Sequence, residues 1–241
     1  MRFYQQHEFN LRCEWGENGI KALASISDVI IIVDVLSFST AVDVATERKA
    51  VIYPYRGSHQ SAIDFAASKG ALLATKGRVA STAFSLSPTS LSAISAGTRL
   101  VLPSPNGSTL SLSTGNKPTL AGCLRNARAV AEFAHQLGEK IAVIPAGERW
   151  EDGSLRPAVE DFIGAGAIMS FLKGSQSPES QVAVSVYQSV ESNLPETLRR
   201  CASGKELIEK GFAGDVELAA QLNCSRSVPL LTEGAYVNQN L

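Results

Sequence analysis

The sequence lacks the features by which several common protein classes are identified. Four cysteines are scattered over 241 residues, and no two of them form a Cys-x-x-Cys pair. This spacing argues against a cysteine-based zinc site and against a disulfide framework. The longest aliphatic run, residues 29–33, is far too short to span a bilayer. Because the first residues contain no apolar signal core, we expect a cytoplasmic protein with reduced thiols and no membrane partner.

An excess of charge of either sign is also missing. The chain has 22 Lys and Arg against 23 Asp and Glu, a formal net charge of −1, and no block of like charges occurs. We therefore expect no nucleic-acid partner. The glycine-rich fingerprints Gly-x-Gly-x-x-Gly and Gly-x-x-x-x-Gly-Lys are absent, and so is a Ser/His/Asp arrangement. A nucleotide-binding domain and a serine hydrolase therefore have little support.

Short apolar runs alternate with helical patterns along most of the chain. The predicted strands include residues 29–35, 50–54, 100–103, 141–144 and 228–231, and the predicted helices include 40–49, 61–69, 127–137 and 159–172. This alternation predicts an α/β sandwich with a largely parallel sheet. No linker divides the pattern, so we expect a single α/β domain over residues 1–241.

A carboxylate follows the most apolar run of the chain. The β-branched residues 29–33 are typical of a strand buried on both faces, and Asp34 stands at its carboxyl end. Ligands of open α/β sheets bind outside these ends, which makes Asp34 a candidate catalytic residue. A cap on the following helix explains Asp34 equally well, and this segment alone leaves both interpretations open.

Polar residues also follow the predicted strand 100–103. The segment Ser104-Pro105-Asn106-Gly107-Ser108-Thr109 resembles an anion cradle. An Asn-Gly turn permits positive φ and can aim successive backbone N–H groups at one point. The hydroxyls of Ser108 and Thr109, with the N-terminus of a following helix, would add donors. An ordinary Asn-Gly turn remains an alternative for the same residues.

A second acidic site stands at the start of the predicted helix 159–172. Glu160 and Asp161 lie in its first turn, where carboxylates complement the helix dipole. Together with Asp34 they would also provide the hard oxygen ligands that Mg²⁺ prefers. The preceding residues 147–153 are predicted to form a loop that covers a pocket.

Five motifs in one order carry a resemblance to a known family. They are Val33-Asp34-Val35-Leu36, Pro105-Asn106-Gly107-Ser108, Gly122-Cys123-Leu124-Arg125-Asn126-Ala127, Val159-Glu160-Asp161-Phe162 with Gly164-Ala165-Gly166, and Ser203-Gly204-Lys205-Glu206-Leu207-Ile208 with Gly211-Phe212 and Asp215-Val216. Together they resemble the 2-phosphosulfolactate phosphatase family, from about Leu11 to Gly234.

The resemblance implies a three-layer α/β/α sandwich with a largely parallel or mixed sheet. It also implies a Mg²⁺-dependent phosphatase that converts 2-phospho-3-sulfolactate to 3-sulfolactate and phosphate, a step toward coenzyme M. The expected roles are catalysis by Asp34 and Glu160, metal binding by Asp34, Glu160 and Asp161, and phosphate binding by Ser104, Asn106, Gly107, Ser108, Thr109 and Asn126. A water or an aspartyl-phosphate mechanism and a homodimer are left open.

The chain departs from the family pattern at three places. Ser37 stands where the family usually has Arg, and Thr75-Lys76 stands where it has Gly-Glu. The family's Phe-Asp-Leu-Gly-Asn-Ser-Pro is shortened to a segment containing Ser85, Phe84-Ser85-Leu86-Ser87-Pro88. Replacing Arg by Ser removes a bidentate anion donor. A non-catalytic binding protein for a small anionic metabolite is therefore the alternative function.

Overall fold

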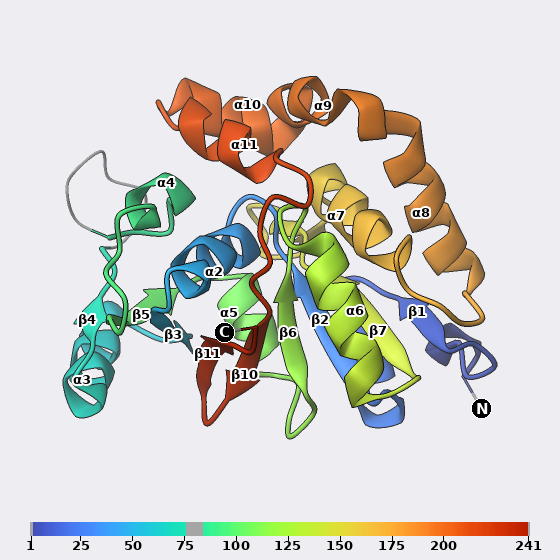
Figure 1. The fold of residues 1–241 in the computed structure, drawn as a ribbon, viewed down its shortest axis with the longest axis horizontal. Coiled ribbons are helices and arrows are strands. Elements are labelled where there is room, and N and C mark those ends of the chain that lie inside the picture. The colour runs from blue at the N-terminus through green and yellow to red at the C-terminus, as the bar shows by residue number, and fades with distance from the viewer. Residues whose placement is uncertain (1, 76–83, 241) are drawn as a thin grey trace.

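A nine-stranded mixed sheet forms the centre of the fold (Figure 1). The computed structural model describes residues 2–75 and 84–240. The strand order is β1-β7-β2-β6-β10-β11-β3-β5-β4. The bounds are β1 Leu11–Cys13, β2 Val29–Val33, β3 Val51–Tyr55, β4 Leu72–Leu73, β5 Arg99–Pro103, β6 Thr119–Gly122, β7 Ile141–Pro145, β10 Pro229–Thr232 and β11 Ala235–Asn238.

Two parallel groups of strands are joined by an antiparallel hairpin. β1, β7, β2 and β6 run parallel, and so do β3, β5 and β4. Between them, β10 pairs antiparallel with β6 and β11, and β11 pairs antiparallel with β3. The hairpin turn places Glu233 at φ 52° and Gly234 at φ 81°, values typical of the turns that suit the twist of a hairpin.

Helices cover both faces of the sheet, which confirms the three-layer α/β/α architecture (Figure 1). Their bounds are α1 Gly16–Leu23, α2 Phe38–Glu47, α3 His59–Lys69, α4 Pro88–Leu91, α5 Gly107–Ser111, α6 Ala127–Leu137, α7 Val159–Met169, α8 Pro178–Val190, α9 Leu194–Arg200, α10 Ala202–Glu209 and α11 Ala213–Ala219. A small antiparallel pair, β8 Glu148–Arg149 and β9 Leu155–Arg156, lies outside the main sheet.

Strand β2 shows why the sheet needs two helical layers. All five of its residues are buried, and successive side chains point to opposite faces. Ile31 belongs to a core cluster with residues of α6, α7 and α8, whereas Ile30 and Ile32 belong to one with residues of α1 and α5. A continuous aliphatic run is therefore favourable on both faces.

The carboxyl ends of several strands meet at one edge of the sheet. Val33 of β2 is in register with Gly122 of β6 and with Pro145 of β7. Figure 1 shows α9, α10 and α11 lying across the upper end of the molecule, beyond this edge. No helix in residues 2–75 or 84–240 has the length and apolar character that crossing a membrane requires.

Candidate active site

Asp34 links two helix starts at the end of β2. Its Oδ1 accepts a hydrogen bond from the Phe38 N–H at 3.0 Å, and its Oδ2 accepts one from the Gly107 N–H at 2.9 Å. The residue is only 5% exposed. The first contact satisfies the first N–H of α2, as expected for a helix cap. The second joins the β2 edge to the start of α5, and the catalytic role of Asp34 stays a prediction.

Asp161 makes a similar pair of contacts from the first turn of α7. Its Oδ1 accepts from the Val35 N–H at 2.7 Å, and its Oδ2 accepts from the Gly147 N–H at 2.8 Å. Burial, together with the negative charges of Asp34 and Glu160, raises the pKa of Asp161 well above its usual range. Asp161 therefore fixes the loops that follow β2 and β7 at a position of strongly negative potential.

Glu160 is buried beside the start of α10. It is 2% exposed and forms a side-chain hydrogen bond with Cys201, the residue that precedes α10. Burial, and then the negative charge of Glu160, raise the pKa of the Cys201 thiol to about 12. Because the thiolate is the nucleophilic form of cysteine, Cys201 is a neutral neighbour of Glu160 and not a nucleophile.

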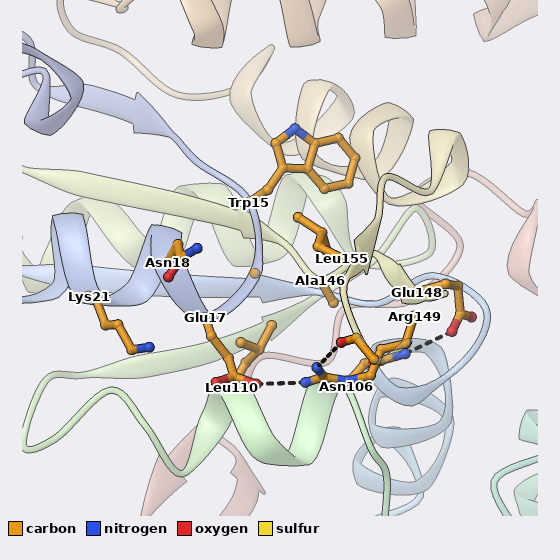
Figure 2. A pocket seen from close by; sticks show the side chains of 12 residues that line it. Trp15, Glu17, Asn18, Lys21, Asn106, Leu110, Ala146, Glu148, Arg149 and Leu155 are labelled. Carbon is orange, nitrogen blue, oxygen red and sulfur yellow. Dashed lines mark hydrogen bonds and ion pairs between the residues drawn. The ribbon is translucent and has the colours of Figure 1, made fainter. Parts of the chain in front are cut away.

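Glu148 is a site residue that the sequence analysis did not identify. It begins β8, immediately after the turn that follows β7, and accepts a 2.8 Å hydrogen bond from the Asn106 amide (Figure 2). Burial and the charges of Asp34 and Glu160 raise the pKa of Glu148 to about 7. Its position at a strand end, equivalent to that of Asp34, is the signal that could have found it.

A small cavity opens beside Asn106 and Glu148 (Figure 2). Its volume is about 210 Å³, below the range of about 300–1,000 Å³ that is typical for drug-sized ligands. Apolar walls come from Trp15, Leu110 and Leu155, and Glu148, Arg149 and Gly153 of the segment 147–153 also line the cavity. A ligand of this cavity must therefore be compact.

Several predicted phosphate donors are engaged within the protein. The Gly107 N–H contacts Asp34, and the Ser108 hydroxyl, which is fully buried, donates to the Leu102 carbonyl at 2.8 Å. Ser104 is also buried, whereas Thr109 is partly exposed. The structure thus brings Asn106 and Gly107 to the acidic cluster and turns the Ser108 side chain toward β5.

Asn126 lies at the end of β6 with its amide hydrogen-bonded to backbone groups. Its Oδ1 accepts from the Cys123 N–H at 2.9 Å, and its Nδ2 donates to the carbonyl oxygens of Ala121 and Ser227 at 3.3 Å. The side chain is fully buried. These contacts fix the β6–α6 turn, and they do not bring Asn126 to the four carboxylates.

The four acidic residues Asp34, Glu148, Glu160 and Asp161 form what we call the carboxylate cluster. In the described parts of the chain, no three Asp, Glu, His or Cys side chains stand close enough to hold one metal ion. Mg²⁺ commonly uses only one or two carboxylates and completes its shell with water and substrate phosphate. The hard oxygens of the cluster, and the raised pKa values of Glu148 and Asp161, therefore suit a divalent cation that binds together with a phosphate.

The departures from the family pattern have different outcomes. Ser37 is buried, and its hydroxyl carries none of the charge that the family's Arg would bring to this position. Ser85 is fully buried, and its hydroxyl accepts a hydrogen bond from the Ser87 N–H at 3.2 Å within a local turn. Lys76 lies outside the described residues. At Ser37 and Ser85, small hydroxyl side chains occupy buried sites.

Comparisons with known proteins agree with the order of motifs. The family model described as 2-phosphosulpholactate phosphatase matches residues 18–234. A probable 2-phosphosulfolactate phosphatase of Carboxydothermus hydrogenoformans is 33% identical over 83% of this chain and 84% of that protein. The 2-phosphosulfolactate phosphatase of Methanothermobacter thermautotrophicus is 33% identical over 56% of this chain and 57% of that protein. The chain belongs to the 2-phosphosulfolactate phosphatase family, a family of phosphoric monoester hydrolases.

Proposed function

We propose that the chain hydrolyses a small acidic phosphate monoester with Mg²⁺ as its cofactor, and that the substrate is 2-phospho-3-sulfolactate. The observation that carries the proposal is the carboxylate cluster at the carboxyl edge of the sheet, next to a compact cavity. The name of the family and of its relatives supports the substrate. The cytoplasmic location and a homodimer stay predictions.

Asp34 and Glu160 would hold Mg²⁺, and Asp161 lies close to both of them. Asp34 and Asp161 each use both carboxylate oxygens on backbone N–H groups, so each would position loops as well as offer its remaining lone pairs to the cation. When bound, Mg²⁺ would neutralise phosphoryl oxygens and lower the pKa of a coordinated water. In return, the cation would relieve the repulsion that raises the pKa of Glu148 and Asp161.

Glu148 is suited to proton transfer in this reaction. Hydrolysis breaks the bond between phosphorus and the ester oxygen, and that oxygen must gain a proton as it leaves. The pKa of Glu148 is about 7 without metal, and the charge of bound Mg²⁺ would lower it, so this carboxyl group can gain and lose a proton near neutral pH. The hydrogen bond from Asn106 holds the Glu148 carboxylate at the cavity wall. Asn106 would therefore orient the Glu148 carboxyl group, and it would also line the part of the cavity that receives the phosphate.

Phosphate release tests the proposal directly. The purified protein should release phosphate from 2-phospho-3-sulfolactate in the presence of Mg²⁺, and EDTA should stop the reaction. Absence of release from this ester and from a broad panel of phosphate monoesters would exclude the phosphatase function. A rise in melting temperature with the ester but without turnover would instead support a non-catalytic binding protein.

A further inference from the structure

The cavity has a basic end opposite the carboxylate cluster. Arg149 of β8 and Lys21 of α1 line it together with Glu17 (Figure 2). Arg149 Nη2 lies 2.6 Å from Glu17 Oε1, and its Nη1 donates to the Gly153 carbonyl at 3.1 Å. The two cations outnumber the single carboxylate, so this end is net positive, whereas Glu148 makes the other end acidic.

The guanidinium of Arg149 has more N–H donors than its contacts within the described part of the chain use. It carries five N–H donors, and the two contacts with Glu17 and Gly153 are those it makes in the described part of the chain. Its side chain is 43% exposed, so an anion in the cavity could reach it. Glu17 restricts its rotation, which reduces the entropy that binding would cost. A planar fork of this kind suits carboxylate or sulfonate oxygens.

We propose that Arg149, positioned by Glu17, binds the second acidic group of the substrate, a carboxylate or a sulfonate. The proposal rests on the proposed phosphatase function, because it places the phosphate at the Asn106–Glu148 end. The cavity of about 210 Å³ restricts the distance between the two anionic groups to that of a compact ester. Arg149 thereby determines specificity, and it takes no part in breaking the ester bond.

The test compares one variant on esters that differ only in the acidic group. Arg149→Gln removes the charge and keeps most of the length of the side chain. If Arg149 binds the carboxylate, the ratio of kcat/KM for 2-phospholactate to that for its carboxyl methyl ester should fall about ten- to hundred-fold, mainly through KM. If Arg149 binds the sulfonate, a fall of the same size should appear in the ratio for 2-phospho-3-sulfolactate to that for 2-phospholactate. Measuring kcat/KM for 2-phospho-3-sulfolactate as well distinguishes binding of the sulfonate from binding of the carboxylate. A loss confined to this substrate assigns Arg149 to the sulfonate, and a loss shared with 2-phospholactate assigns it to the carboxylate.

Arg199→Gln is the matched control. Arg199 is also 43% exposed and forms a 2.6 Å ion pair with Glu217, between α9 and α11 and outside the cavity lining. This variant should leave both ratios unchanged. Glu17→Gln should lower the affected ratio by a smaller factor than Arg149→Gln, because the charge of Arg149 remains but its position is less restricted. An equal loss on 2-phospho-3-sulfolactate, 2-phospholactate and the methyl ester after Arg149→Gln, or no loss on any of them, would overturn the proposal.

Binding of the product gives a readout that does not depend on turnover. Calorimetric titration with 3-sulfolactate, which has no phosphate, should show weaker binding to Arg149→Gln than to the wild type and to Arg199→Gln. Unchanged binding would contradict the role of Arg149. If the wild type hydrolyses no phosphate ester and yet 3-sulfolactate binding depends on Arg149, then the phosphatase function fails while the acid-binding role stands.

Discussion

Replacing Glu148 by Gln should stabilise the metal-free protein at alkaline pH. The variant keeps an oxygen that can accept the hydrogen bond from Asn106 and loses only the charge. Moving the pKa from its ordinary value of 4.5 to about 7 corresponds to about 3 kcal/mol, as an upper figure. The folded state holds the proton more tightly than the unfolded state, so wild-type stability falls as pH rises through this range. The variant avoids that loss.

Urea unfolding in the presence of EDTA measures the effect. The free energy of unfolding of Glu148→Gln should equal that of the wild type at about pH 4 and exceed it by up to about 3 kcal/mol at about pH 8.5. Glu139→Gln, at an exposed position, serves as the control and should show no such difference. A constant offset at both pH values, or a variant that is less stable at pH 8.5, would refute the reasoning. Mg²⁺ should reduce the difference by stabilising the wild type more.

Three further substitutions test contacts around the cluster and the buried ion pair. Asp34→Asn should abolish most phosphate release and destabilise the fold by about 2 kcal/mol, since an amide can accept from only one of the Phe38 and Gly107 N–H groups; full activity would exclude the proposed site. Gly107→Ala should cost about 1–3 kcal/mol in urea unfolding, because its Cβ would lie 2.2 Å from the Phe38 ring; wild-type stability would show that the ring moves freely. Arg125→Met should destabilise by about 3–5 kcal/mol near neutral pH, because Asp43, 2.8 Å away and fully buried, loses its cation. Burial raises the pKa of Asp43 to about 6 even with Arg125 present, and loss of the cation would raise it further, so the destabilisation should shrink as pH falls toward 6, and a loss independent of pH would contradict this account.

The local patterns predicted the strands and helices better than their pairing. The helix 127–137 has the predicted bounds, and the predicted strand 228–231 overlaps β10. Its insertion between β6 and β3 could not be predicted, because it depends on contacts such as Leu230 with Leu120 that join distant parts of the chain. Hydrophobic periodicity indicates which residues are buried, but it does not identify the neighbouring strand.

The candidate site could be predicted only as far as backbone position determines it. Asp34 and Glu160 follow strand and helix boundaries that the sequence shows, and the structure brings them together. The directions of Ser108 and Asn126 depend on side-chain rotation within packed turns, which the sequence pattern does not contain. The interpretation of residues 147–153 as a covering loop misses Glu148, because the local pattern does not indicate that Glu148 pairs with Arg156 in the small β8–β9 sheet beside the site.

The antiparallel hairpin β10–β11 has a consequence for how the chain assembles during synthesis. The hairpin occupies the middle of the sheet, yet the ribosome makes it after every other strand of that sheet. On one side of the hairpin, Leu230 of β10 pairs with Leu120 of β6, and on the other side Tyr236 of β11 pairs with Ile52 of β3. Until these residues leave the ribosome, the two parallel groups each present an unpaired edge where the hairpin will insert. The nascent chain therefore carries two open β edges until its last strands are added.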